Sequence, residues 1–164
     1  MATSFQHEQT FQADPAAVMA MLRDPDYIRT KCDRTGSMDT TVSVEDGPDG
    51  GCVITSVRVL PAKLPSAVKK FVGDTITVTE RQEWAAPGPD GTASAAGTVE
   101  FSAPMAFTAT ITLEADGPAT RVRTEGSFKA SVPFVGGSIE GTAADLTRKY
   151  LEVEQAVGNE WLAG

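Results

Sequence analysis

The sequence predicts an α+β protein in which a curved antiparallel β-sheet wraps around one long C-terminal α-helix, with two short helices after the first strand. Segments of strand periodicity, separated by strong turn signals, fill most of residues 38–130. Residues 138–161 then change to helical periodicity. Their apolar stripe consists of Ile139, Ala143, Leu146, Tyr150, Val153, Val157 and Trp161. Because so wide a stripe has to be buried, the sheet is its expected partner, and charged residues such as Glu154 are expected on the other faces.

The N-terminal part predicts a strand followed by two short helices. Apolar and polar residues alternate over residues 5–12, as in a half-buried strand. Asp14-Pro15 supplies an N-cap and a first-turn proline for a helix, which Asp24-Pro25 ends. A second helix is expected over about residues 27–34.

Six further strands are predicted in hairpin order. They span residues 38–45, 52–60, 74–84, 92–101, 106–114 and 120–130. In the last two, apolar and polar residues separate onto opposite faces, so one sheet face should be covered and the other should contact water. In residues 52–60 either face fits the inner position, because Cys52 and Ile54 compete with Val53 and Val57.

Residues 61–73 interrupt the strands. Leu64, Val68, Phe71 and Val72 recur at helical spacing and predict one or two helical turns. This segment fits a surface helix or a mobile lid over a cavity, and its lysines only weakly favour contact with a membrane.

Length and charge restrict the classes of protein. The 164 residues fit one domain, residues 1–164, and the apolar and charged fractions of 41% and 22% are ordinary for a globular protein. A net charge of −8 argues against nucleic acid and anionic membranes as partners. No apolar run approaches the roughly 20 residues of a membrane span, and the N-terminus has no signal-peptide pattern. A cytoplasmic protein without stable membrane insertion is therefore expected.

Motifs for metals and cofactors are missing from the sequence. Cys32 and Cys52 are far apart and form no CxxC motif, and His7 is the single histidine, so no zinc site or cofactor is expected. The two thiols are expected to stay reduced. No GxSxG elbow supports a serine hydrolase. Residues 136–138, Gly-Gly-Ser, could present N–H groups to an anion, but a flexible start of the last helix is the favoured interpretation.

The order of elements resembles the START-like, Bet v 1-like (SRPBCC) helix-grip fold, and the chain resembles more specifically the actinobacterial DUF2505 family of unknown function. The motifs that carry the resemblance are Phe11-Gln12-Ala13-Asp14-Pro15 with Val18, Asp24-Pro25-Asp26-Tyr27, the strand that ends in Trp84, and Val132 to Glu140. The superfamily includes lipid carriers, hormone receptors, polyketide cyclases and co-chaperones. The resemblance therefore implies a fold and assigns no catalytic residue, so function has to be argued from the site.

In such a fold, the inner faces of the strands and the last helix line a cavity. Aromatic residues make up only 7% of the chain, and small residues on the expected inner faces leave space. These are Ala95, Gly97, Ala109, Gly126, Ala130 and Ala143. The sequence thus predicts non-covalent binding of a small apolar or amphipathic molecule, such as a lipid, a fatty acid or a polyketide-like compound. The candidate cavity residues are His7, Gln9, Arg58, Glu80, Gln82, Trp84, Phe107, Ala109, Phe128, Leu146 and Tyr150.

The polar members of this set leave alternatives open. Strand alternation places His7, Gln9, Glu80 and Gln82 on inner faces, where they would satisfy one another or a ligand's polar head. His7 with Glu80 could instead form the acid–base pair of a cyclase or hydratase. A protein-binding module with a filled core is a third possibility. Trp84 and Trp161 fit either core packing, which is favoured, or stacking on a flat ligand.

Overall fold

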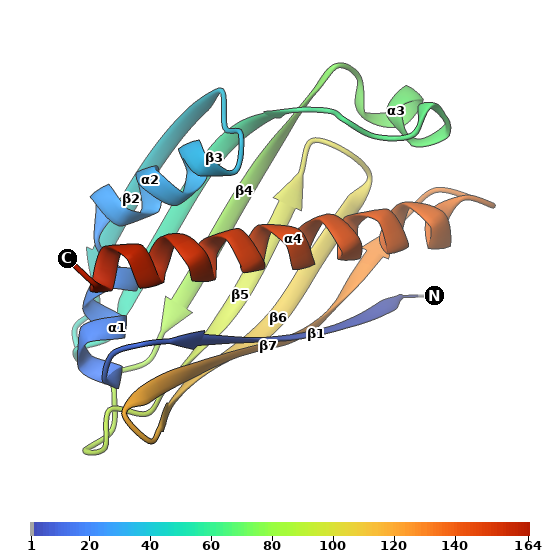
Figure 1. The fold of residues 1–164 in the computed structure, drawn as a ribbon. Helices are drawn as coiled ribbons and strands as arrows, with labels where there is room; N and C mark the ends of the chain where they lie inside the picture. The colour runs from blue at the N-terminus through green and yellow to red at the C-terminus, as the bar shows by residue number, and fades with distance from the viewer. Residues whose placement is uncertain (1) are drawn as a thin grey trace.

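The computed structural model describes residues 2–164, apart from the side chains of Val68 and Phe71. Its centre is a seven-stranded antiparallel sheet with the order β1-β7-β6-β5-β4-β3-β2 (Figure 1). The strands are β1 (Thr3–Phe11), β2 (Asp39–Asp46), β3 (Cys52–Pro61), β4 (Thr75–Trp84), β5 (Ala93–Phe101), β6 (Met105–Asp116) and β7 (Ala119–Ala130). The helices are α1 (Pro15–Leu22), α2 (Pro25–Arg34), α3 (Ser66–Val72) and α4 (Gly136–Leu162). The predicted fold class is confirmed.

Helices α1 and α2 begin at aspartate–proline pairs. The Asp14 carboxylate accepts a hydrogen bond from the Ala17 N–H at 2.8 Å, and the Asp24 carboxylate accepts one from the Asp26 N–H at 2.9 Å. Because Asp24 caps α2 as well as ending α1, α2 begins at Pro25, two residues before the predicted start.

The long helix α4 crosses the concave side of the sheet (Figure 1). Its close neighbours are β1, β7, α1 and α2, so it lies over one edge of the sheet rather than over its middle. Near its start, the buried Glu140 accepts hydrogen bonds from the Thr3 hydroxyl at 2.7 Å and from the Ala130 N–H at 2.8 Å. Near its end, Gly158 packs directly on Phe11. Helix α4 is thus joined to β1 and β7 along its length.

This placement changes which face of α4 is buried. Ile139, Ala143 and Val157 are buried as predicted, but Leu146 is 46% exposed. Glu154, predicted on an outer face, is buried. The predicted stripe is therefore only partly a core stripe, because one flank of α4 faces the sheet edge and the other faces an open interior.

The structure also shows which face of β3 points inward. Cys52, Ile54, Ser56 and Arg58 are buried, whereas the alternating valines are half-buried on the other face. Helix α3 confirms the helical turns predicted within residues 61–73, and it lies at the end of the sheet opposite α1 and α2 (Figure 1). The predicted contributions of the Val68 and Phe71 side chains fall outside the described part of the structure.

Two apolar clusters hold the fold together. One lies beneath α1 and α2 and includes Phe11, Tyr27 and Trp84. The other contains Phe5, Phe107 and Phe128, in which Phe107 and Phe128 stack with ring centroids 4.2 Å apart and Phe5 meets both edge-on. Such aromatic contacts add to the free energy gained from burial alone.

Candidate functional site

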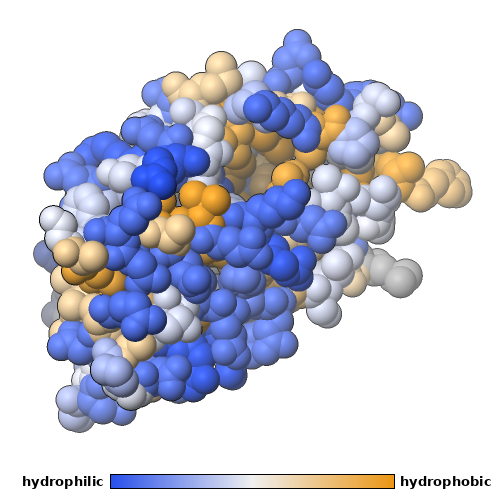
Figure 2. All heavy atoms as spheres, in the orientation of Figure 1, coloured by the Kyte–Doolittle hydropathy of each residue, from blue (hydrophilic) through white to orange (hydrophobic). Residues whose placement is uncertain are grey.

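A cavity of about 610 Å³ lies between α4 and the inner faces of β3 to β6. In Figure 2 it is visible as a hollow with hydrophobic walls, between α4 and the segment that carries α3. The register of the strands explains its depth: Gly97 lies opposite Gln82 on one side and Ala109 on the other, and Ala109 lies opposite Gly126. Three neighbouring strands therefore carry small residues at the same level, where larger side chains would fill the interior.

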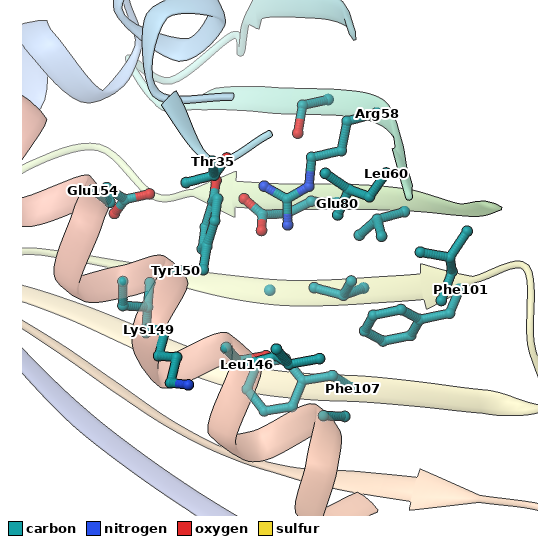
Figure 3. A pocket seen from close by; sticks show the side chains of 18 of the residues that line it. Thr35, Arg58, Leu60, Glu80, Phe101, Phe107, Leu146, Lys149, Tyr150 and Glu154 are labelled. Carbon is teal, nitrogen blue, oxygen red and sulfur yellow. The ribbon is translucent and has the colours of Figure 1, made fainter. Parts of the chain in front are cut away.

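One end of the cavity is apolar. Leu60, Phe101 and Phe107 reach it from the sheet, and Leu146 reaches it from α4 (Figure 3). Leu64 and Val72, from the segment around α3, also contribute to this lining. A hydrocarbon or ring system would remove these side chains from water.

The other end contains Arg58, which comes from the inner face of β3. Its carbon Cζ lies 4.0 Å from the centroid of the Tyr150 ring, a cation–π distance. Arg58 is only 7% exposed, yet its Nε and Nη1 atoms are buried without a hydrogen-bond partner, as is the Tyr150 hydroxyl. Burial acts to lower the pKa of Arg58, but the nearby Tyr150 and Glu80 together raise it by more. The net pKa is therefore above its usual value, and the guanidinium stays charged. Burial raises the pKa of Tyr150 to about 12, so its hydroxyl stays protonated at neutral pH.

Glu80 lies near this guanidinium (Figure 3) but is held by its own strand. The Trp84 indole N–H donates to the Gln82 side-chain oxygen at 2.9 Å, and the Gln82 amide donates to Glu80 at 3.3 Å. All three residues point inward from β4, as alternation predicted. Among the described side chains, no salt bridge within 4.0 Å joins Arg58 to Glu80.

Lys31 and Glu154 form a buried ion pair beside the cavity. Lys31 Nζ lies 2.6 Å from Glu154 Oε2, while the Gln9 amide donates to Glu154 Oε1 at 3.0 Å and to the Leu151 carbonyl at 2.9 Å. Burial acts to lower the pKa of Lys31, but Glu154 more than compensates and the pKa rises. The pair joins α2 to α4 and contacts β1 through Gln9.

His7 lies apart from this polar end. It points inward from β1, as predicted, but contributes nothing to the cavity lining and stands beside Phe5, with ring centroids 6.5 Å apart. Partial burial lowers its pKa, opposed by the charge of Glu152. Because β7, β6 and β5 separate β1 from β4, and neighbouring strands lie about 4.8 Å apart, the two strands are about 19 Å apart along the sheet. The register also places Trp84, four residues from Glu80, in line with His7. The predicted acid–base pair is not assembled.

The cavity brings together most of the predicted site residues. Its lining includes Gln9, Arg58, Glu80, Gln82, Trp84, Phe107, Ala109, Leu146 and Tyr150. Phe128 is instead a fully buried residue of the aromatic cluster, because Phe107 and Phe5 cover its ring. Trp161 packs edge-on against Tyr27, away from the lining.

Within residues 2–164, no three histidine, cysteine, aspartate or glutamate side chains gather closely enough to hold a metal ion. Cys32 and Cys52 are both free and buried. The helices described here include none with the length and apolar character needed to cross a bilayer.

Residues 6–162 match the model of a family described as "Protein of unknown function (DUF2505)". The chain belongs to this family. Its fold is the START-like, Bet v 1-like helix-grip fold that the motifs around Asp14-Pro15 and Trp84 implied. A search of curated proteins found no match.

Three solved structures show how widely this DUF2505 fold is shared. The protein TTHA0849 from Thermus thermophilus is 16% identical, with a TM-score of 0.67 over 98% of this chain and 97% of that one. The Zhui aromatase/cyclase from a Streptomyces species (R1128) is 12% identical, with a TM-score of 0.64 over 99% and 94%. A STAR-related lipid transfer protein from Xanthomonas axonopodis is 14% identical, with a TM-score of 0.61 over 93% and 84%. At these identities the similarity concerns the fold alone.

Sequence reasoning missed the Lys31–Glu154 pair in this DUF2505 chain, although a signal was present. Lys31 lies four residues after Tyr27 and three after Ile28, on the buried side of α2. Glu154 lies four residues after Tyr150 and three before Val157, on the same side of α4. Opposite charges on two apolar stripes could have indicated a buried pair, because each charge needs the other when water is removed.

Proposed function

We propose that this protein binds a small apolar or amphipathic molecule non-covalently in the cavity between α4 and the sheet. The observation that carries the proposal is the cavity itself: about 610 Å³ in volume, with a mainly apolar wall that also includes polar and charged side chains such as Arg58 and Glu80. Pockets for small molecules have volumes of roughly 300–1,000 Å³ and the same mixture of an apolar wall and a few polar groups.

The ligand classes we infer are lipids, fatty acids and polyketide-like compounds. A STAR-related lipid transfer protein and an aromatase/cyclase share the fold, which supports both classes. The division of the cavity into an apolar end around Phe101 and a polar end around Arg58 suits an amphipathic molecule of either class.

The alternatives receive less support from the geometry. A cyclase or hydratase that uses His7 and Glu80 would need the two side chains on one substrate, and the sheet separates them. A protein-binding module with a filled core would have large side chains at Gly97 and Ala109, which line the cavity. Ligand binding is therefore the favoured function.

A neutral dye tests the cavity without depending on its charged groups. Nile red should bind saturably, with an increase in its fluorescence. Ala109→Trp should abolish that response, because the indole would occupy the space above the small residues. Thr110→Trp is the matched control, because it adds the same bulk to the exposed outer face of the same strand. Full binding by an Ala109→Trp protein with an unchanged far-UV spectrum would contradict the proposal.

A further inference from the structure

The guanidinium of Arg58 is a buried charge, and two of its nitrogen atoms have no hydrogen-bond partner of good geometry in the described structure. Arg58 Nε, Arg58 Nη1 and the Tyr150 hydroxyl are buried and have no hydrogen-bond partner among the described residues. Buried polar groups are rarely left unsatisfied, because each loses its bonds to water on folding. Both residues line the cavity, so the unused donors adjoin the proposed binding space.

The neighbouring charges do not satisfy Arg58. Lys31 and Glu154 neutralise one another at 2.6 Å. Glu80 accepts from Gln82 and forms no salt bridge with Arg58 in the described structure. The polar end of the cavity therefore contains a guanidinium that contacts the Tyr150 ring and has no ion-pair partner among the described side chains.

The orientation of Arg58 determines what it can bind. One face of the guanidinium lies against the Tyr150 ring at 4.0 Å, which leaves the N–H groups at its edge for hydrogen bonds in its own plane. A carboxylate fits such an edge, because its two oxygens accept two parallel N–H bonds. A hydroxyl or an ester offers a weaker, uncharged acceptor.

We propose that Arg58 binds the carboxylate of an amphipathic acid, assisted by the Tyr150 hydroxyl. The apolar part of the ligand then extends past Leu146 and Phe107 toward Phe101 (Figure 3). This inference rests on the proposed function and adds the ligand's head group and its orientation. The acid can be a fatty acid or an aromatic, polyketide-like acid, since Arg58 recognises only the group they share.

Displacement of Nile red by ligands that differ in their head group tests the proposal. The wild-type protein should bind dodecanoate about tenfold or more tightly than dodecanol, the difference expected for one charge-assisted bidentate contact. Arg58→Met should remove this preference while Nile red still binds, because methionine keeps an apolar contact with Tyr150. Arg81→Met is the control: Arg81 is exposed on the outer face of β4, outside the cavity lining, and paired with Glu83 at 2.8 Å, so the preference should persist.

The outcomes separate the two proposals. Failure of Nile red to bind the wild-type protein overturns the proposed function itself. If Nile red binds but dodecanoate and dodecanol displace it equally well, only the role of Arg58 is overturned. The same holds if dodecylamine binds more tightly than dodecanoate, which would indicate Glu80 as the anchor. These comparisons use the wild-type protein and stand even if Arg58→Met does not fold. Binding of dodecanoate or of 2-naphthoate that weakens in Arg58→Met supports the proposal. Whichever acid the wild-type protein binds more tightly shows whether the ligand is a fatty acid or an aromatic acid.

Discussion

At the scale of single residues, burial separates two apolar positions that helical periodicity treats alike. Val157 is 2% exposed within the core beneath α1 and α2, whereas Leu146 is 46% exposed at the cavity. Val157→Asp should unfold the protein, since an unpaired buried carboxylate costs several kcal/mol against a total stability of about 5–15 kcal/mol. Leu146→Asp should leave the melting temperature almost unchanged and weaken Nile red binding. Equal losses of thermal stability in the two variants would contradict this difference.

The buried ion pair leads to a second prediction. Lys31→Met should reduce the free energy of unfolding by about 3–5 kcal/mol, because it leaves the Glu154 carboxylate buried without its counter-charge. Adding Glu154→Leu should restore much of the loss, because the second change removes the stranded charge. Urea unfolding measures both effects.

The exposed pair between Arg34 and Glu160 is the control for this experiment. Arg34→Ala should leave the midpoint of urea unfolding almost unchanged, because water screens both charges. A double variant of the buried pair that is less stable than Lys31→Met alone would show that Glu154 is stabilised by groups other than Lys31.

At the scale of elements, the contact between α4 and β1 depends on the absence of a side chain at one position. A Cβ atom added at Gly158 would lie 2.5 Å from Phe11 Cε1 and 3.1 Å from Met21 Cε, both in the core. Gly158→Ala should therefore destabilise the protein by about 1–3 kcal/mol through overpacking. Gly141→Ala, in the same helix but with no atom within 4 Å of the added Cβ, should be neutral or stabilising by up to about 1 kcal/mol. Thermal unfolding compares the two, and the reverse order would contradict the close contact.

At the scale of the whole molecule, the sequence predicts the elements better than their lateral placement. The change from period two to helical period locates α4, and strand alternation correctly places Glu80, Gln82 and Trp84 on the inner face of β4. Alternation shows on which face of the sheet a side chain lies. It does not show whether α4 or the open cavity covers that part of the sheet. His7 therefore faces inward and still lies outside the cavity lining, although Gln9, two residues along the same strand, contributes to it.

The charged residues show the same limit of prediction from the sequence. Glu154 is a charged residue on the apolar side of α4, and its burial depends on Lys31, which comes from a different helix. Arg58 Nε and Nη1 lack hydrogen-bond partners because of how Glu80, Gln82 and Tyr150 are arranged around them. These residues come from different elements, so no local sequence pattern shows the arrangement. Pairings between distant elements decide these positions, so the fold was predictable and the polar chemistry of the site was only partly so.

The close approach of β7 to β6, beside the cavity, leads to the last prediction. A Cβ atom at Gly126 would lie 2.0 Å from the Thr108 carbonyl oxygen and 2.7 Å from Ala109 Cα, which are backbone atoms that cannot rotate away. Gly126→Ala should therefore force the two strands apart, lower the melting temperature and weaken Nile red binding together. At Gly97, by contrast, an added Cβ would meet only the end of the Ile111 side chain at 3.3 Å, so Gly97→Ala should cost less stability. A Gly126→Ala protein with wild-type stability and binding would show that the sheet, and the cavity it encloses, does not depend on this approach of the two strands.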